Sequence, residues 1–258
     1  MIKIGIVTLF YKNHNYGAQL QAYALQKILS NYGYKAEQIV IDFENDCRQV
    51  RKKRIKKTAG ILKVYYIKKY VIFSIFKNIE ENFTKKLTIK SSEYEKFFNS
   101  IPHSLKIYKE DNIKESLDYY NVFICGSDVI WHENQNPYIS SLGFVPDNIL
   151  KISYGSSIGT DSISEIWLNK YLKYVSRLQY ISVREKNIQN QLKKINNAVA
   201  LTVDPVLLIS KQEWEKLTNS NKYGDYILCY LLGDSHIQRK RVKEFAKKYE
   251  IKLITLPY

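Results

Sequence analysis

Short polar side chains follow an apolar run near the middle of the chain, where they can bind or deprotonate a hydroxyl group. The residues that follow the run 121–125 include Gly126, Ser127, Asp128, Trp131 and His132. A glycine permits a sharp turn at the end of a strand, and serine and aspartate present short hydrogen-bonding side chains there. Asp128 is therefore a candidate base for a substrate hydroxyl. In the alternative, Asp128 caps a helix N-terminus and Trp131 only packs.

An arginine and two acidic residues end two further apolar runs. Arg184 and Glu185 follow residues 180–183, and Asp204 follows residues 200–203. Because a planar guanidinium binds a carboxylate or phosphate through two parallel hydrogen bonds, Arg184 is the best candidate for holding an anionic substrate. In the alternative, Arg184 forms an ion pair with Glu185 or Asp204 that only ties the edge of a sheet together.

The first loop of the chain has the composition of a ligand-binding loop. After the apolar run 2–9 come several polar residues, among them His14, Asn15, Tyr16 and Gly17. A glycine that opens a helix lets backbone amides approach an anion at the positive end of the helix dipole. His14 can carry a proton near neutral pH. The alternative is an ordinary strand–loop–helix turn, since no dinucleotide or Walker glycine spacing is present.

These residues need a scaffold that brings strand ends together, and the alternation of apolar runs with helical patterns predicts one. Strands are expected at 2–9, 35–43, 121–125, 151–154, 180–183 and 200–203, with helices at 18–32, 164–174 and 211–217. Near-continuous apolar runs are typical of parallel strands buried on both faces. We therefore predict an α/β fold with a Rossmann-like parallel sheet and flanking helices. The candidate residues, and Ser156 in the small-residue loop 155–159, are expected at its carboxyl edge.

The pattern changes twice along the chain. Residues 48–76 are rich in lysine and arginine, contain no acidic residue, and interleave these charges with apolar and aromatic side chains. Such a stretch suits the headgroup region of an anionic membrane, and a helical insertion packed on the sheet is an equal alternative. From Asp225 a new strand–helix–strand pattern begins. We predict an N-terminal domain at 1–220 with a helical insertion at about 47–100, and the first βαβ unit of an incomplete Rossmann-like domain at 221–258.

Composition narrows the class of protein. A formal net charge of +15 over 258 residues favours an anionic partner, although a coding bias toward lysine produces the same excess. Nucleic acid is not expected, because no nucleic-acid-binding motif accompanies the charge. The three cysteines stand far apart and no cluster has metal-ligand spacing, so we expect neither a disulfide framework nor a metal site. The absence of a signal peptide indicates a cytoplasmic protein, with peripheral binding at the inner face of the membrane as an option.

Five motifs occur in a fixed order along residues 2–217. They are Asn15-Tyr16-Gly17-Ala18 with residues 20–25, Gly126-Ser127-Asp128-x-x-Trp131, residues 153–159, residues 182–185, and Asp204-Pro205-x-Leu207-Leu208 with Trp214. Together they resemble the polysaccharide pyruvyl transferase family. The resemblance implies two Rossmann-like domains facing a cleft, as in GT-B glycosyltransferases. It also implies phosphoenolpyruvate as the donor substrate, no further cofactor, and a glycan or lipid-linked sugar as the acceptor.

The chain departs from the family's pattern at several positions. Members usually carry Gln and Asn where this chain has Val129 and His132, and an Ala-Ala pair where it has Gly155-Ser156. The family's second domain also carries an Arg-x-His motif that holds the donor and takes part in proton transfer, and no segment of this sequence matches it. We therefore expect the chain to be a fragment or a truncated product, whose activity alone is an open question.

The resemblance and the residue types together assign roles. Asp128, Arg184 and His14 are the catalytic candidates. The substrate-binding candidates are Asn15, Tyr16, Gly17, Gly126, Ser127, Trp131, His132, Ser156, Glu185 and Asp204. The predicted reaction transfers pyruvate from phosphoenolpyruvate to a pair of sugar hydroxyls, forming a ketal in surface-glycan synthesis. Two alternatives stay open: a GT-B-type glycosyltransferase of polysaccharide synthesis, and a non-catalytic membrane-surface module that uses residues 48–76.

Overall fold

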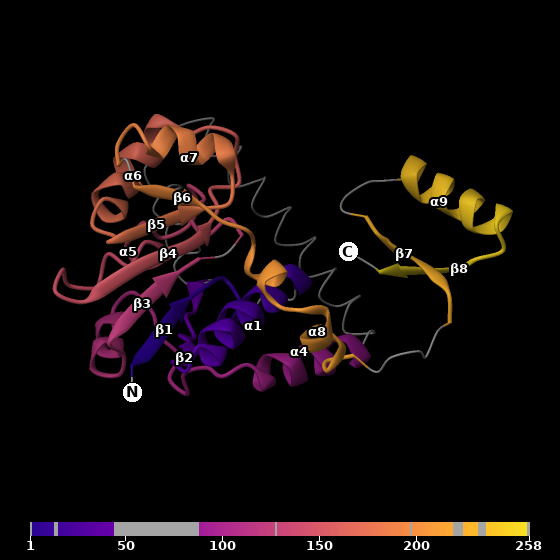
Figure 1. The fold of residues 1–258 in the computed structure, drawn as a ribbon, viewed down its shortest axis with the longest axis horizontal. Helices are drawn as coiled ribbons and strands as arrows, with labels where there is room; N and C mark the ends of the chain where they lie inside the picture. Colours follow the sequence, from indigo (N-terminus) through magenta and orange to yellow (C-terminus); the bar gives the residue numbers. More distant parts are fainter. Residues whose placement is uncertain are drawn as a thin grey trace, which may run out of the picture. The chain divides into compact units, whose positions relative to one another are not determined.

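The computed structural model describes residues 2–12, 15–43, 88–126, 128–196, 198–218, 224–231 and 236–256. The chain divides into two compact units, Met1–Ile209 and Ser210–Tyr258 (Figure 1). The basic segment 48–76, His14 and Ser127 lie outside the described residues, so the predictions made for them stay predictions.

The first unit is built on a six-stranded sheet in which all neighbouring strands run parallel. In spatial order the strands are β2 (Lys35–Gln38), β1 (Lys3–Val7), β3 (Val122–Cys125), β4 (Leu150–Ser156), β5 (Tyr180–Val183) and β6 (Val199–Leu201) (Figure 1). This order confirms the predicted α/β fold with a parallel sheet. Each of the six predicted strands overlaps one of these strands, and β4 extends beyond the predicted run 151–154 at both ends.

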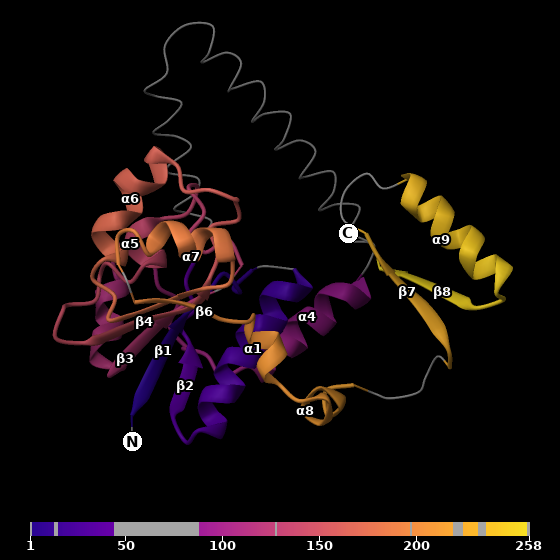
Figure 2. The ribbon, with the colours of Figure 1, turned by 45° about the horizontal axis from the view of Figure 1, so that its top comes forward.

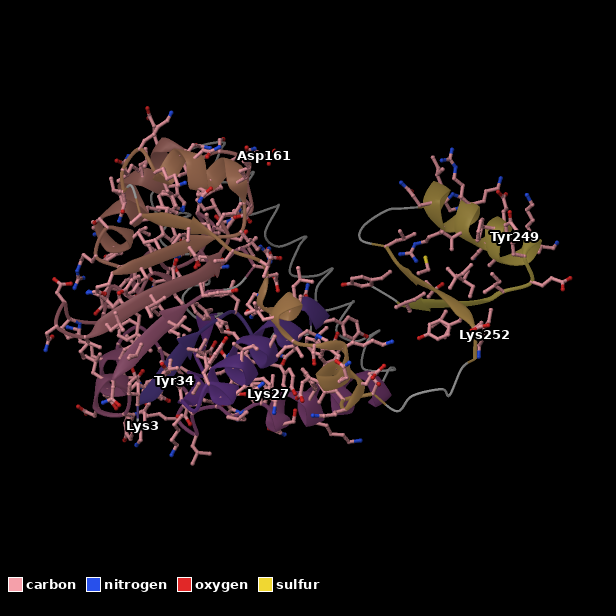
Figure 3. The ribbon with its side chains drawn as sticks, viewed as in Figure 1. Lys3, Lys27, Tyr34, Asp161, Tyr249 and Lys252 are labelled. Carbon is pink, nitrogen blue, oxygen red and sulfur yellow. The ribbon has the colours of Figure 1, made fainter. Side chains whose placement is uncertain are left out.

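The order of the strands reverses between β1 and β3. The chain leaves β1 for β2 on one side, and then returns to β3 on the other side and continues outward to β6. In open α/β sheets, ligands bind outside the carboxyl ends of the strands at such a reversal. Figure 3 labels Lys3, the first residue of β1, and Asp161, in the loop after the carboxyl end of β4.

Helices cover both faces of this sheet (Figure 2). They are α1 (Tyr16–Asn31), α4 (Thr88–Ser100), α5 (Pro137–Ser140), α6 (Glu165–Val175) and α7 (Lys186–Leu192), with 3-10 turns η1 (Ile113–Asp118) and η2 (Pro205–Leu208). Ile4 and Ile6 of β1 pack against Leu25 of α1 on one face. Phe123 of β3 shares the larger core on the other face with Trp167 of α6. Because successive side chains of a strand point to opposite faces, the sheet carries one apolar layer on each face.

Helix α1 begins two residues earlier than its apolar periodicity suggests, because Asn15 caps it. The Asn15 side chain accepts a hydrogen bond from the backbone N–H of Ala18 at 3.2 Å. Such a cap satisfies one of the backbone donors left unpaired in a first helical turn. At the other end Gly33 adopts φ +84°, the left-handed conformation that ends many helices. The side-chain hydrogen bond of Asn15 therefore fixes the end of the first loop to the start of α1.

Strand β2 is shorter than predicted. The sequence favours a strand over 35–43, whereas β2 ends at Gln38. Beyond it the chain stays extended and buried but exchanges partners: Tyr108 donates its N–H to the carbonyl of Val40 at 2.8 Å, and Asp42 donates to the carbonyl of Tyr108 at 2.9 Å. An apolar run cannot distinguish a strand paired in the main sheet from a buried segment paired with a loop.

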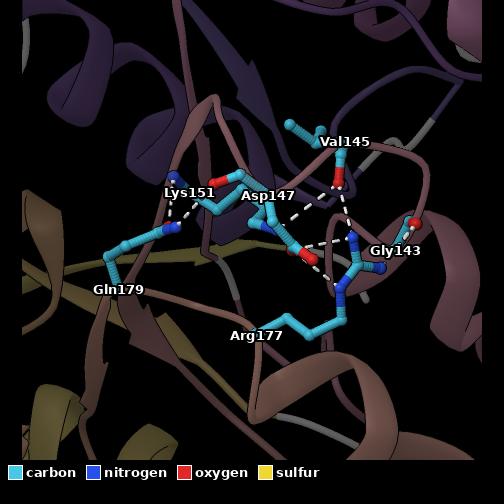
Figure 4. Close-up of polar contacts among 6 residues, drawn as sticks. All are labelled: Gly143, Val145, Asp147, Lys151, Arg177 and Gln179. Carbon is cyan, nitrogen blue, oxygen red and sulfur yellow. Dashed lines mark hydrogen bonds and ion pairs between the residues drawn. The ribbon is translucent and has the colours of Figure 1, made fainter.

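A charged cluster fixes the loop before β4 at the amino edge of the sheet (Figure 4). The side chain of Lys151 is 1% exposed, and its ammonium group lies 2.5 Å from the Asp147 carboxylate and 3.4 Å from the carbonyl of Val145. Arg177 binds the same carboxylate through Nε at 2.9 Å and the carbonyl of Val145 through Nη2 at 3.0 Å. A buried ammonium is tolerated when it is paired in this way.

The second unit contains α8 (Lys211–Glu215) and one strand–helix–strand repeat: β7 (Tyr226–Tyr230), α9 (His236–Lys248) and β8 (Lys252–Leu256). Strands β7 and β8 pair in parallel. Cys229 of β7 and Ala246 of α9 are buried. The pattern that begins at Asp225 therefore forms a strand–helix–strand unit with parallel strands, and its place in a second Rossmann-like domain stays a prediction.

Candidate active site

Arg184 lies between three carboxylates at the carboxyl edge of the sheet. Its Nη2 and Nη1 atoms form ion pairs with Asp128, which follows β3, and with Asp204, which follows β6. Its Nε lies 3.6 Å from Oε1 of Glu185. An ion pair of Arg184 with Glu185 or Asp204 is the alternative to substrate binding that the sequence predicts, and both pairs are present. Asp128 is a third partner, which the sequence does not predict. Among the described residues, Arg184 thus contacts three carboxylates.

The two aspartates that hold Arg184 differ in exposure and support. The side chain of Asp204 is 23% exposed, and its Oδ1 accepts a hydrogen bond from the backbone N–H of Val206 at 3.1 Å, which fixes it at the start of η2. The side chain of Asp128 is 61% exposed. Residues 128–131 form turns, so Asp128 does not cap a helix. Asp204 is therefore the anchored partner of Arg184, and Asp128 is the partner open to solvent.

Glu185 contributes a buried carboxylate oxygen. It directly precedes α7, and its Oε1 faces Arg184. Its Oε2 is buried without a hydrogen-bond partner among the described residues. A buried acceptor without a donor costs free energy of about 1–3 kcal/mol. A group that donates to this oxygen would remove that cost.

A bulge in β4 shapes the edge beside Arg184 and changes the predicted small-residue loop. Strand β4 continues through Gly155 to Ser156, and its register against β5 shifts between Ser153 and Ser156. Gly155 has φ +55°, and its N–H donates to the hydroxyl of Ser182 at 3.0 Å, while the N–H of Ser182 donates to the hydroxyl of Ser153 at 3.0 Å. Serine side chains thus replace ladder bonds. Ser156 is fully buried, and its role as a substrate ligand stays a prediction.

Gly126 sits where only glycine fits. A Cβ atom at this position would lie 2.0 Å from the carbonyl oxygen of Tyr154 in β4. The backbone N–H of Gly126 donates to the carbonyl of Val7 at 3.2 Å, which ties the end of β3 to the end of β1. Glycine is thus required for close approach of strands at the reversal point of the sheet.

Trp131 and His132 follow Asp128 but face different surroundings. Trp131 is fully buried, and its Nε1 donates to the carbonyl of Ser140 at 3.1 Å, so it packs in the core. His132 is partly exposed, and its Nδ1 accepts from the N–H of Asn134 at 3.2 Å. Of the two, His132 retains a side chain that solvent or a ligand can reach.

The loop after β1 brings a second charged pair to the same edge. Lys12 adopts φ +53°, an uncommon conformation for a residue with a side chain. Its Nζ lies 3.3 Å from Oδ2 of Asp42, whose side chain is 10% exposed. Asn15 caps α1, and Tyr16 and Gly17 are its first two residues. Asp42 lies near the end of the predicted strand 35–43, but the sequence does not show that Lys12 binds it.

The described residues show neither a metal cluster nor a membrane span. Within these parts of the chain, no group of three or more His, Cys, Asp or Glu side chains is arranged to hold a metal ion. Over the same residues, no helix has the length and hydropathy needed to cross a bilayer.

A comparison with known families identifies the family of the chain. The model of a family described as polysaccharide pyruvyl transferase matches residues 15–258, which include Asp128, Arg184, Glu185 and Asp204. The chain belongs to the polysaccharide pyruvyl transferase family. A search of curated proteins finds no match for it. As a pyruvyl transferase family member the chain is a transferase, and the family implies a pyruvate donor and a sugar acceptor.

Proposed function

We propose that this family member transfers the pyruvyl group of phosphoenolpyruvate to two hydroxyls of a sugar, forming a cyclic ketal, in the synthesis of a surface glycan. The observation that carries the proposal is the placement of Arg184 between an anchored carboxylate, Asp204, and an exposed one, Asp128, in a chain of this family.

The reaction needs a cation for the donor and a base for the acceptor. A proton reaches the methylene carbon of phosphoenolpyruvate while an acceptor hydroxyl attacks the adjacent carbon; phosphate leaves, and a second hydroxyl closes the ring. The two hydroxyl protons balance the one gained by the new methyl group and the one carried by the released phosphate. Fixed cations favour the anionic donor, and a positioned carboxylate can accept a hydroxyl proton.

We propose that Arg184 and its carboxylate partners supply both the cation for the donor and the base for the acceptor. The donor carboxylate or phosphate displaces Asp128 from Arg184, because Asp128 is the more exposed partner, whereas Asp204 stays bound through Val206. Once it is displaced from the guanidinium, the exposed carboxylate of Asp128 can accept the proton of an acceptor hydroxyl. A second hydroxyl that donates to Oε2 of Glu185 gives that buried oxygen its missing partner.

The remaining assignments belong to the same proposal. His14 is proposed to take part in proton transfer. Asn15, Tyr16, Gly17, Gly126, Ser127 and His132 are proposed to surround the substrates. We propose that residues 221–258 belong to a second Rossmann-like domain of a GT-B-like enzyme. We also propose that the enzyme works in the cytoplasm beside a lipid-linked acceptor, with residues 48–76 at the membrane surface.

The test is release of inorganic phosphate from phosphoenolpyruvate by the purified chain in the presence of glycan or lipid-linked acceptors. The expected product gains the mass of one pyruvate less one water and shows the methyl resonance of a ketal. Binding of a nucleotide sugar, with no binding of phosphoenolpyruvate, would instead identify a glycosyltransferase and refute the proposal.

A further inference from the structure

A pocket of about 350 Å³ lies beside the loop after β1, away from Arg184. Its aromatic walls are Tyr11, Tyr94 and Phe98, and its polar groups include Lys12, Glu95 and Asn99. A volume of this size lies at the lower end of the range for small-molecule sites. None of these side chains has a role in the reaction proposed above.

The aromatic walls are held in place by the core. The ring of Phe98 stacks on buried Phe10 with centroids 5.1 Å apart, and Tyr11 lies against Phe98 at 5.9 Å. Tyr94 packs on Tyr16 of α1 at 5.0 Å. Because each ring contacts another on a neighbouring element, α4 and the loop after β1 present a shaped surface without further ordering. A preorganised wall lowers the entropic cost of binding a ligand.

The charges around this pocket favour a neutral ligand over an anion. The ammonium group of Lys12 lies 3.3 Å from Oδ2 of Asp42, which compensates its charge. Glu95 adds a second carboxylate to the lining. Among the described residues that line or adjoin the pocket, a free phosphate or carboxylate ligand would meet two acids, Asp42 and Glu95, and one cation, Lys12. Amide, carboxylate and ammonium groups around aromatic walls instead match the hydroxyls of a neutral polyol.

We infer that this pocket binds a sugar ring of the acceptor at a distance from the reacting hydroxyls. The inference rests on the proposed function. A pyranose presents C–H bonds on its faces and hydroxyls around its edge. The faces of aromatic rings carry partial negative charge that attracts polarised C–H groups. Tyr11 therefore meets the face of the ring, the edge of buried Tyr94 closes the pocket, and Glu95 and Asn99 meet the hydroxyls.

The position of the pocket also sets the size of the acceptor. It adjoins the loop after β1, whereas Arg184 follows β5, and β3 and β4 lie between these two strands. With neighbouring strands about 4.8 Å apart, the pocket and Arg184 are separated by roughly 14 Å or more. One sugar ring cannot span that separation. The acceptor is therefore an oligosaccharide or longer glycan that occupies both places at once.

The test measures sugar binding without phosphoenolpyruvate. The probes are the methyl glycosides of glucose, galactose, mannose and N-acetylglucosamine, each titrated into the full chain and followed by saturation-transfer NMR. We expect at least one glycoside to bind the wild type. Tyr11→Ala should weaken that binding about fivefold or more, while Tyr11→Phe, which keeps the ring, should retain it. Glu95→Ala should weaken it as well, and Glu165→Ala in the first turn of α6 serves as the control.

Failure of this inference differs from failure of the proposed function. If no glycoside binds the wild type, or if Tyr11→Ala binds as the wild type does while its circular dichroism shows a folded protein, the pocket is not a sugar subsite. Binding of inorganic phosphate with no binding of glycosides would also overturn the assignment. Phosphate release from phosphoenolpyruvate is measured separately, so either result can stand without the other.

Discussion

Gly126 of the β3 edge faces the carbonyl oxygen of Tyr154 so closely that a Cβ atom would lie 2.0 Å from it. Backbone atoms of two paired strands cannot separate without breaking the ladder between β3 and β4. Gly126→Ala should therefore lower the free energy of unfolding by about 3 kcal/mol, because the strands must shift to admit the methyl group. Urea unfolding followed by circular dichroism measures this change.

A matched control comes from the first turn of α1. Gly17 lies in the first turn of α1, and among the described residues an added Cβ atom would come close only to Oδ1 of Asn15, at 3.2 Å, a contact that a shift of this side chain by a few tenths of an ångström relieves. Alanine is favoured over glycine in a helix by about 0.5–1 kcal/mol. Gly17→Ala should thus leave the stability unchanged or raise it. Equal loss of stability in both variants would contradict the packing argument for Gly126.

Because Arg184 contacts several carboxylates at once, we expect that lysine cannot replace Arg184 in donor binding. Lysine carries the charge but not the planar fork that binds Asp204 and a second anion at once. Arg184→Lys should reduce the rate of phosphate release from phosphoenolpyruvate about 100-fold. Arg177→Lys is the control, because Arg177 binds Asp147 at the amino edge of the sheet. Equal activity of wild type and Arg184→Lys would exclude Arg184 as the donor clamp.

At Asp128 we expect a loss of turnover without a loss of donor binding. Asp128→Asn removes the proposed base and also removes a carboxylate that competes with the donor for Arg184. We expect kcat to fall about 100-fold or more. The KM for phosphoenolpyruvate should stay the same or fall. A rise in KM with unchanged kcat would assign Asp128 to donor binding instead of proton transfer, and steady-state kinetics separates the two outcomes.

The parallel sheet and the edge that carries the candidate residues could be predicted from the sequence. Near-continuous apolar runs such as 121–125 and 180–183 predict parallel strands, and parallel strands bring Asp128 and Arg184 to one edge. The pairing of these two residues, 56 positions apart, was not predicted, because it depends on which strands are neighbours. Periodicity reports the local conformation of a segment and not its partners.

The bulge in β4 and the pocket beside the loop after β1 could not be predicted from the sequence patterns. Gly155 suggests a loop, but hydrogen bonds between Ser153 and Ser182 let β4 continue through a bulge. Tyr94 and Phe98 fit an ordinary helical pattern, and only their packing beside the loop after β1 reveals the pocket. Side chains that replace ladder bonds, or that meet across distant segments, leave no signal in the spacing of residues.

Burial makes Cys125 chemically inert. It is fully buried at the end of β3, and burial raises the pKa of its thiol to about 12. Since the thiolate is the reactive form, Cys125 should not react with a thiol reagent at pH 8 in the folded protein. In a Cys47→Ser, Cys229→Ser background, modification of Cys125 should require denaturant and should follow the loss of circular dichroism. Rapid labelling of the native protein would show that this strand end opens readily.

The last prediction concerns acid stability and the cluster at the amino edge. Lys151, and then Arg177, lower the pKa of the Asp147 carboxyl through hydrogen bonds and charge. A carboxyl whose pKa is lowered by folding contributes stability above its unfolded pKa of about 3.9, and this contribution is lost as the pH falls through the folded pKa. The wild type should therefore lose stability below about pH 4 through this group.

The variants isolate this contribution. Asp147→Asn should lower the melting temperature at pH 7, because buried Lys151 keeps its charge without its carboxylate partner. The difference between wild type and Asp147→Asn should shrink as the pH falls below the folded pKa of Asp147, since the wild type then carries a neutral side chain too. Lys151→Met, which removes the buried charge, should reduce the effect of Asp147→Asn in the double variant. Thermal unfolding from pH 2 to pH 7 tests these expectations, and a constant difference across that range would contradict them.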